Sequence, residues 1–108
     1  MAEVAVTRED HGRVVVAKVG DVISVHLPEN PTTGYSWAID SIDAKRLEAD
    51  APTYHSEGAG LGAGGARRWN FRARAPGRAR VGLKRWRHWE GDDSVVERFA
   101  VTLDIKPD

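Results

Sequence analysis

Cysteine is absent from this 108-residue sequence, which excludes disulfide bonds and thiolate metal sites. The usual indicator of an oxidising compartment is therefore missing too. No apolar run approaches the roughly 20 residues needed to span a bilayer, so we expect no membrane association. The first residues also lack the basic start and apolar core of a signal peptide. As written, the sequence indicates a cytoplasmic protein, or a periplasmic or secreted one if a leader was removed.

The sequence also lacks a net charge, because 16 basic residues balance 16 acidic ones. Locally, residues 66–89 hold nine Lys or Arg and no acid, with tryptophans among them, a combination found in nucleic-acid-binding proteins. The competing interpretation is that these basic residues alternate with Ala, Val and Leu and face solvent from two neighbouring strands. We favour the second interpretation, which applies to Arg72, Arg74, Arg78, Arg80 and Lys84.

Motifs for enzymatic chemistry are also scarce. Glycines at 60, 62 and 65 match the spacing of a dinucleotide-binding loop, but the run precedes a strand-like pattern where that motif requires a helix. Serines occur without a nucleophile elbow. The histidines are too widely spaced for a common metal-ligand pattern; they are His11, His26, His55 and His88. We expect no cofactor, no metal and no enzymatic activity.

What the sequence does contain is alternation with a period of two, the pattern of half-buried strands. It recurs over residues 35–40, 69–75 and 99–105, and β-branched residues mark further strands at 13–18 and 22–27. A helical turn is plausible only at 40–49. The length fits one domain, and many short strands without a long helix predict an all-β sandwich of two sheets.

Three loops between these strands are unusual: 30–34, the glycine-rich 58–65, and the segment 86–94. Sandwich loops cluster at the ends of the sheets, so three such loops at one end would form a binding edge. Trp37 and Trp69 are in phase with apolar neighbours and are predicted to lie in the core. Trp86 is compatible with either core or surface. Trp89 lies in a loop, and tryptophan is enriched at interface hot spots.

Four segments together carry a family resemblance: 30–37 (N-P-T-T-G-Y-S-W), 61–65 (L-G-A-G-G), 87–89 (R-H-W) and 97–99 (E-R-F). In order and spacing they resemble the chagasin family, protein inhibitors of papain-family cysteine peptidases. That family has N-P-T-T-G-[aromatic]-x-W, L-G-A-G-G and R-P-W in its three loops. The likeness covers most of the chain.

The resemblance implies an immunoglobulin-like β-sandwich of about seven to eight strands, formed by a single inhibitor domain over residues 1–108. It implies that the first loop plugs the catalytic centre of a papain-family cysteine peptidase, flanked by the other two loops. The inhibitor would be a monomer that binds reversibly and noncovalently, without a membrane or nucleic acid. The implied peptidase-binding residues are Asn30, Pro31, Thr32, Thr33, Gly34, Leu61, Gly62, Ala63, Gly64, Gly65, Arg87, His88 and Trp89.

One position departs from the family pattern. His88 stands where the family has proline, and histidine does not restrict φ as proline does. Two other functions are compatible with the residues: a nucleic-acid-binding sandwich with a basic face, and an immunoglobulin-like interaction module without a peptidase target.

Overall fold

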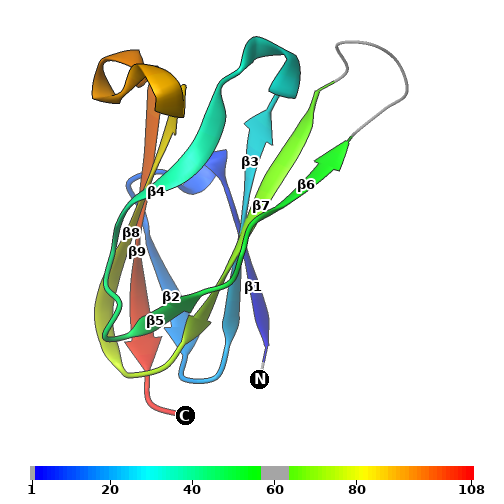
Figure 1. The fold of residues 1–108 in the computed structure, drawn as a ribbon. Coiled ribbons are helices and arrows are strands. Elements are labelled where there is room, and N and C mark those ends of the chain that lie inside the picture. The colour runs from blue at the N-terminus through cyan, green and yellow to red at the C-terminus, as the bar shows by residue number, and fades with distance from the viewer. Residues whose placement is uncertain (1, 57–63) are drawn as a thin grey trace.

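The computed structural model describes residues 2–56 and 64–108, which form nine strands in two facing sheets (Figure 1). One sheet has the order β1 (Glu3–Thr7), β3 (Val22–Glu29), β7 (Gly65–Ala73) and β5 (Leu47–Ala49), with β6 (Thr53–Ser56) also paired to β7. The other has the order β2 (Val14–Lys18), β9 (Glu97–Lys106), β8 (Gly77–Trp86) and β4 (Ser36–Ile42).

Both sheets are mixed, because β1 runs parallel to β3 and β2 runs parallel to β9, while the other pairs are antiparallel. The predicted all-β sandwich is confirmed. The strand number exceeds the expected seven to eight because the sequence pattern does not reveal β1, β5 and β6, which are only three to five residues long. Strands of that length carry too few residues for a clear alternation.

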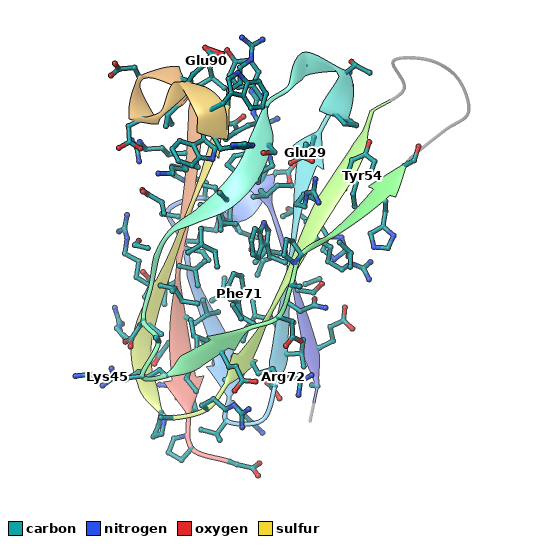
Figure 2. All side chains as sticks on the ribbon, in the orientation of Figure 1. Glu29, Lys45, Tyr54, Phe71, Arg72 and Glu90 are labelled. Carbon is teal, nitrogen blue, oxygen red and sulfur yellow. The ribbon has the colours of Figure 1, made fainter. Side chains whose placement is uncertain are left out.

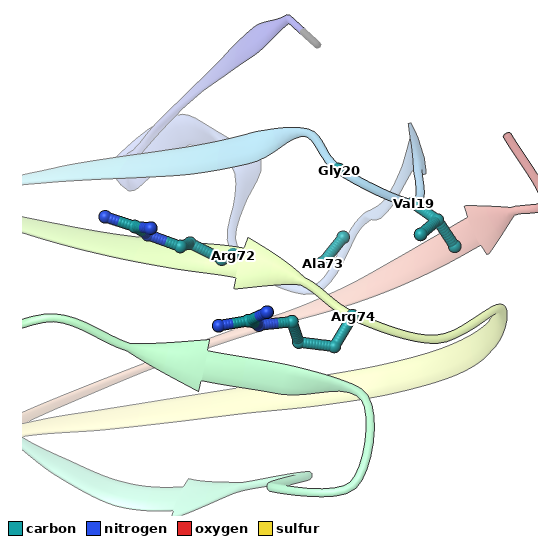
Figure 3. A pocket seen from close by; sticks show the side chains of 5 residues that line it. All are labelled: Val19, Gly20, Arg72, Ala73 and Arg74. Carbon is teal, nitrogen blue, oxygen red and sulfur yellow. The ribbon is translucent and has the colours of Figure 1, made fainter.

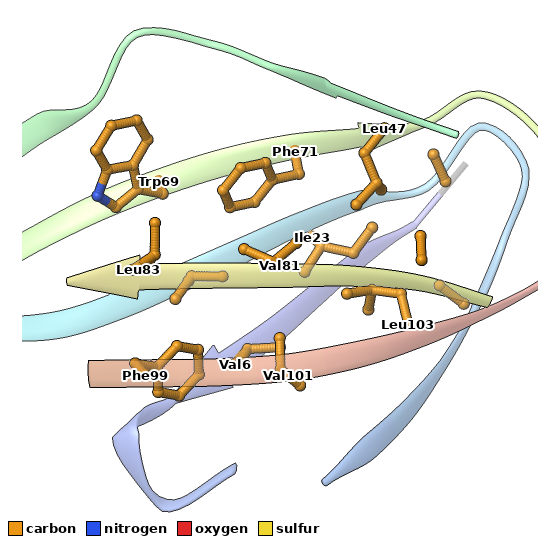
Figure 4. Packing of buried hydrophobic residues seen from close by; sticks show 14 of the residues in the cluster. Val6, Ile23, Leu47, Trp69, Phe71, Val81, Leu83, Phe99, Val101 and Leu103 are labelled. Carbon is orange, nitrogen blue, oxygen red and sulfur yellow. The ribbon is translucent and has the colours of Figure 1, made fainter. Parts of the chain in front are cut away.

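The core lies between the sheets and is built from the alternate residues of the long strands (Figure 4). Phe71, Val81 and Leu103 are among the fully buried side chains. Trp37 and Trp69 are 3% and 7% exposed, so the prediction that both lie in the core is confirmed. Full burial of such side chains stabilises a fold by about 1.5–3 kcal/mol each.

Helical geometry in residues 2–56 and 64–108 is limited to four three-residue 3-10 turns: η1 (Arg8–Asp10), η2 (Pro31–Thr33), η3 (His88–Glu90) and η4 (Asp92–Ser94). The prediction of a helical turn at 40–49 covers too many residues. Strand β4 continues to Ile42, and only one turn follows, closed by hydrogen bonds from the Arg46 and Leu47 N–H groups to the Asp43 carbonyl. Within the described ranges no helix is long and apolar enough to cross a membrane.

The basic residues of 66–89 do not form one face, because β7 and β8 belong to different sheets. Arg72, Arg74, Arg78 and Arg80 are exposed, as predicted. Lys84 is not: its side chain is 13% exposed, and its ammonium lies 3.0 Å from Asp92 Oδ1 and 3.8 Å from the centre of the Trp86 ring. The prediction of two neighbouring basic strands with a solvent-facing Lys84 is therefore wrong.

Acidic partners accompany Arg72, which lies on β7, and Arg74, which follows the end of that strand. Arg72 lies 3.4 Å from Asp50, and Arg74 pairs with Glu48. Both arginines border a shallow hollow of about 270 Å³ beside Val19 and Gly20 (Figure 3). Because the guanidinium groups are already paired, this hollow offers no concentrated positive charge to a phosphate backbone.

Candidate functional site

Turns from distant parts of the chain meet at one end of the sandwich (Figure 1). Turn η2 joins β3 to β4, and turns η3 and η4 join β8 to β9. The paired ends of β6 and β7 at Ser56 and Gly65 also lie at this end. We call this the loop end and define it as residues 30–35, 64–65 and 87–94.

The first loop is held in one conformation by its own side chains. The Asn30 side-chain oxygen accepts hydrogen bonds from the Thr32 N–H (3.1 Å) and the Thr32 hydroxyl (2.7 Å), as an N-cap residue does. The Thr33 hydroxyl donates to the Asn30 carbonyl (2.8 Å) and lies 3.2 Å from the Tyr35 nitrogen, whose N–H it accepts. Pro31 occupies the first position of the turn, where its fixed φ is favourable.

Gly34 ends this turn in the left-handed region, with φ 79° and ψ −8°. Its N–H donates to the Pro31 carbonyl (3.2 Å). Glycine adopts this conformation without the steric cost that other residues incur. Pro31, Thr32 and Thr33 remain exposed, so the result is a rigid turn with small side chains at its tip.

The third loop contacts the first through Arg87. Its Nη2 donates to the Thr33 carbonyl (3.0 Å), and its guanidinium carbon lies 4.3 Å from the centre of the Tyr35 ring. Glu90 accepts from Arg87 Nη1 (3.2 Å). The Arg87 backbone is fixed in turn by Ser94, whose hydroxyl accepts from the Arg87 N–H (3.0 Å). Arg87 therefore joins two loops that are 54 residues apart.

Trp89 makes the second contact between these loops. Its ring lies so close to Gly34 that a Cβ there would be 3.1 Å from Trp89 Cη2. The indole is nevertheless 63% exposed, so one side supports the first loop and the rest faces solvent. The exposed His88 ring meets it edge-on, with ring centres 5.1 Å apart. The structure thus brings Arg87 and Trp89 against the predicted first loop, with His88 packed on Trp89.

The second predicted loop is only partly covered, because Leu61, Gly62 and Ala63 lie outside the described residues. Gly64 and Gly65 border a hollow of about 230 Å³ that Asn30 also lines. A Cβ at Gly65 would lie 2.3 Å from the His55 carbonyl oxygen and 2.5 Å from the Tyr54 hydroxyl. Gly65 is thus required for packing between β6 and β7.

The base of the first loop contains a polar cluster that the sequence interpretation missed. Glu29, labelled in Figure 2, is the last residue of β3. It is buried and pairs with Arg67. It also accepts the Trp37 N–H (2.8 Å). A signal was available: Glu29 follows Val25 and Leu27 in the inward phase of β3, and Arg67 precedes Trp69 in the inward phase of β7.

No group of three metal-ligating side chains occurs in the part of the chain that the structure describes. His11 accepts the Ala100 N–H (3.0 Å), which fits a structural role. His26 lies 3.0 Å from the Ser24 hydroxyl, and burial together with the nearby Arg68 lowers the pKa of its imidazole. His11, in the turn between η1 and β2, and His26, on β3, therefore both make contacts within the fold.

Comparisons with known proteins agree with the sequence resemblance. The family model "Chagasin family peptidase inhibitor I42" matches residues 16–103. Chagasin from Trypanosoma cruzi is 30% identical over 103 residues, which cover 91% of this chain and 94% of chagasin.

Solved structures share the fold. The cysteine protease inhibitor EhICP2 from Entamoeba histolytica matches with a TM-score of 0.87 at 21% identity, covering 98% of this chain and 97% of that one. PbICP-C, solved in complex with falcipain-2, matches with a TM-score of 0.67 at 13% identity, covering 96% and 89% of the two chains.

Proposed function

The chain belongs to the chagasin family of peptidase inhibitors, and on this premise we propose that it inhibits papain-family cysteine peptidases reversibly and noncovalently. It is then an inhibitor and not an enzyme. The observation that carries the proposal is the first loop: a rigid turn with exposed small residues at its tip, supported from the side by Arg87 and Trp89. EhICP2 is itself a cysteine protease inhibitor, and PbICP-C is bound to falcipain-2.

The turn has the shape of a plug for a narrow cleft. Thr32 and Thr33 enter the cleft and cover the nucleophile, while Gly64, His88 and Trp89 contact its walls. Because hydrogen bonds within the loop fix it before binding, little conformational entropy is lost on association. A footprint of about 800 Å² on each partner is normal for such inhibitors.

The same hydrogen bonds explain why the loop would resist cleavage. A scissile carbonyl must be free to enter the donors of an oxyanion hole. The carbonyls of Asn30 and Pro31 accept the N–H groups of Thr33 and Gly34, and the Thr33 carbonyl accepts Arg87. Each is already used within the inhibitor. The peptide bonds that follow these three residues are therefore poorly placed for attack by the nucleophile.

The test is titration of papain with the protein, using a fluorogenic substrate. Reversible inhibition predicts that activity returns on dilution and that mass spectrometry finds the chain intact and unattached to the enzyme. Lasting loss of activity, or a cleaved chain with no inhibition, would contradict the proposal.

Nucleic-acid binding is disfavoured by a specific observation: the arginines of β7 and β8 lie on different sheets, and Arg72 and Arg74 have acidic partners. Fluorescence anisotropy with a DNA duplex distinguishes the two functions. Binding that weakens steeply with rising salt would indicate phosphate contacts. A module without a peptidase target would give no response with either papain or DNA.

A further inference from the structure

Glu29 is a buried carboxylate directly before the first loop, with its side chain only 1% exposed. One oxygen, Oε1, accepts the Trp37 backbone N–H (2.8 Å). The other, Oε2, accepts Arg67 Nε (3.1 Å) and pairs with Arg67 Nη2. Its backbone carbonyl lies 3.5 Å from the Tyr54 hydroxyl. This residue of β3 therefore contacts β4, β6 and β7 (Figure 2).

These contacts close the base of the loop. The Glu29 carboxylate and the Trp37 N–H stand on the two sides of residues 30–36, and the Trp37 indole also donates to the Pro28 carbonyl (2.9 Å). The two ends of the loop are thus fixed to each other by two hydrogen bonds. Arg67 fixes the same carboxylate to β7, the strand that begins at Gly65.

A buried ion pair is a poor means of stabilising a fold. Apolar residues of similar volume are often as stable or more so, because they need no desolvation of charge. The pair at Glu29 and Arg67 stands in the inward phase of two strands that otherwise place Leu27 and Trp69 inward. The ion pair at this position is therefore better explained by geometry than by stability. Hydrogen bonds to a carboxylate have defined directions, whereas apolar contacts do not.

We propose that Glu29, oriented by Arg67, is the positioning residue of the inhibitory loop: its carboxylate fixes Trp37, and thereby the angle at which residues 30–36 leave the sandwich. The inference rests on the proposed function. Arg67 also lies beside the Tyr54 ring, 5.5 Å from its centre, so the same pair links the first loop to the β6–β7 hairpin.

The experiment compares two double variants that both lack the ion pair. In Glu29→Gln with Arg67→Met, the amide oxygen can still accept the Trp37 N–H. In Glu29→Met with Arg67→Met, no acceptor remains. Neither variant contains an unpaired buried charge, so we expect both to fold. Inhibition constants for papain and melting temperatures are measured for each variant and for the parent.

We expect the Gln/Met variant to inhibit within about threefold of the parent and the Met/Met variant to be about tenfold weaker or more, because a loop that is not fixed beforehand must be ordered on association. The unpaired Trp37 N–H should also lower the melting temperature of the Met/Met variant by several degrees, so inhibition is measured well below both melting temperatures. Equal inhibition by both variants would overturn the proposal, because the acceptor would then have no effect on the loop.

A second measurement does not depend on a peptidase. Hydrogen exchange of the Thr32 and Gly34 amides, which form hydrogen bonds within the loop, reports its order in the free protein. We expect exchange about tenfold faster in the Met/Met variant than in the Gln/Met variant. If papain is not inhibited even by the parent, the proposed function fails, and this exchange difference still decides the positioning role. Equal exchange rates would overturn it.

Discussion

The indole of Trp89 lies against Gly34, so that any Cβ at position 34 would be 3.1 Å from Cη2 and 3.4 Å from Cζ2 of the ring. These residues come from different loops, yet each restricts the other. Gly34 must lack a side chain for its φ of 79° and for the ring above it. The first and third loops therefore behave as one surface.

Gly34→Ala tests this contact. The positive φ costs a residue with a Cβ about 1–2 kcal/mol, and the Trp89 ring must also shift. We expect weaker inhibition of papain together with a lower melting temperature. The control is Gly12→Ala, which has the same strained φ of 80° with nothing within 4 Å of the added Cβ. Loss of inhibition in both variants would mean that strain alone, and not the Trp89 contact, is responsible.

Thr32→Arg tests the plug. Thr32 is exposed at the loop tip, so the fold should keep its stability, while the long side chain prevents the tip from entering a cleft. We expect inhibition at least about 30-fold weaker, or about 2 kcal/mol, mainly through faster dissociation. Val16→Arg adds the same charge at a residue of β2 that is 61% exposed, and it should inhibit normally. Unchanged inhibition by Thr32→Arg would remove Thr32 from the interface.

The two glycines at the start of β7 are expected to differ. A Cβ at Gly65 would lie 2.3 Å from a backbone oxygen, whereas one at Gly64 would meet nothing within 4 Å. Gly65→Ala should lower the melting temperature by several degrees, the effect of about 1–3 kcal/mol of overpacking in a small domain. Gly64→Ala should melt like the parent. Matching melting curves for the two variants would show that the hairpin adjusts freely at Gly65.

The core could be predicted from the sequence because alternation identifies inward residues without any knowledge of the partner strand. Trp37 and Trp69 were placed correctly in this way. The same rule could not assign strands to sheets. Strands β7 and β8 are consecutive in sequence but belong to different sheets, so their arginines do not share a face. Lys84 was misplaced because its acidic partner, Asp92, comes from a loop.

The first loop was predictable as a turn, because its residues act locally. Asn30, Pro31 and Gly34 form the cap, first position and end of one turn. Contacts between distant segments carried no such signal. Nothing near Arg87 in the sequence indicates that it donates to the Thr33 carbonyl, and the inward phase of Glu29 suggested burial without naming Arg67 as its partner.

Trp89→Ala separates binding from packing at the third loop. The indole is 63% exposed in the free protein, so we expect only a small change in melting temperature. If the exposed face is buried by a peptidase, affinity should fall by at least about 2 kcal/mol, as at an interface hot spot. Trp69→Ala is the contrast, because emptying a core position costs about 3–5 kcal/mol of stability. Normal inhibition by a less stable Trp89→Ala would make Trp89 a packing residue only.

His88→Pro asks whether the third loop gains from the proline that the family has at this position. His88 is the first residue of turn η3, where proline is favoured because its missing N–H would have no partner within the turn. The preceding Arg87 is extended, with φ −102° and ψ 109°, the conformation that a following proline prefers. The backbone is therefore already compatible with the substitution.

Proline at this position should stiffen the loop that carries Trp89 and lower the entropy of the unfolded chain. The free energy of unfolding should rise by about 0.4–1 kcal/mol. We expect a slightly higher melting temperature and a two- to fivefold tighter inhibition of papain, about the same free energy. His88→Ala removes the edge-on contact with Trp89 without restricting φ, so it isolates the loss of the ring. If His88→Pro inhibits less well than His88→Ala, the loop must change its backbone on binding, and stiffness at position 88 opposes inhibition.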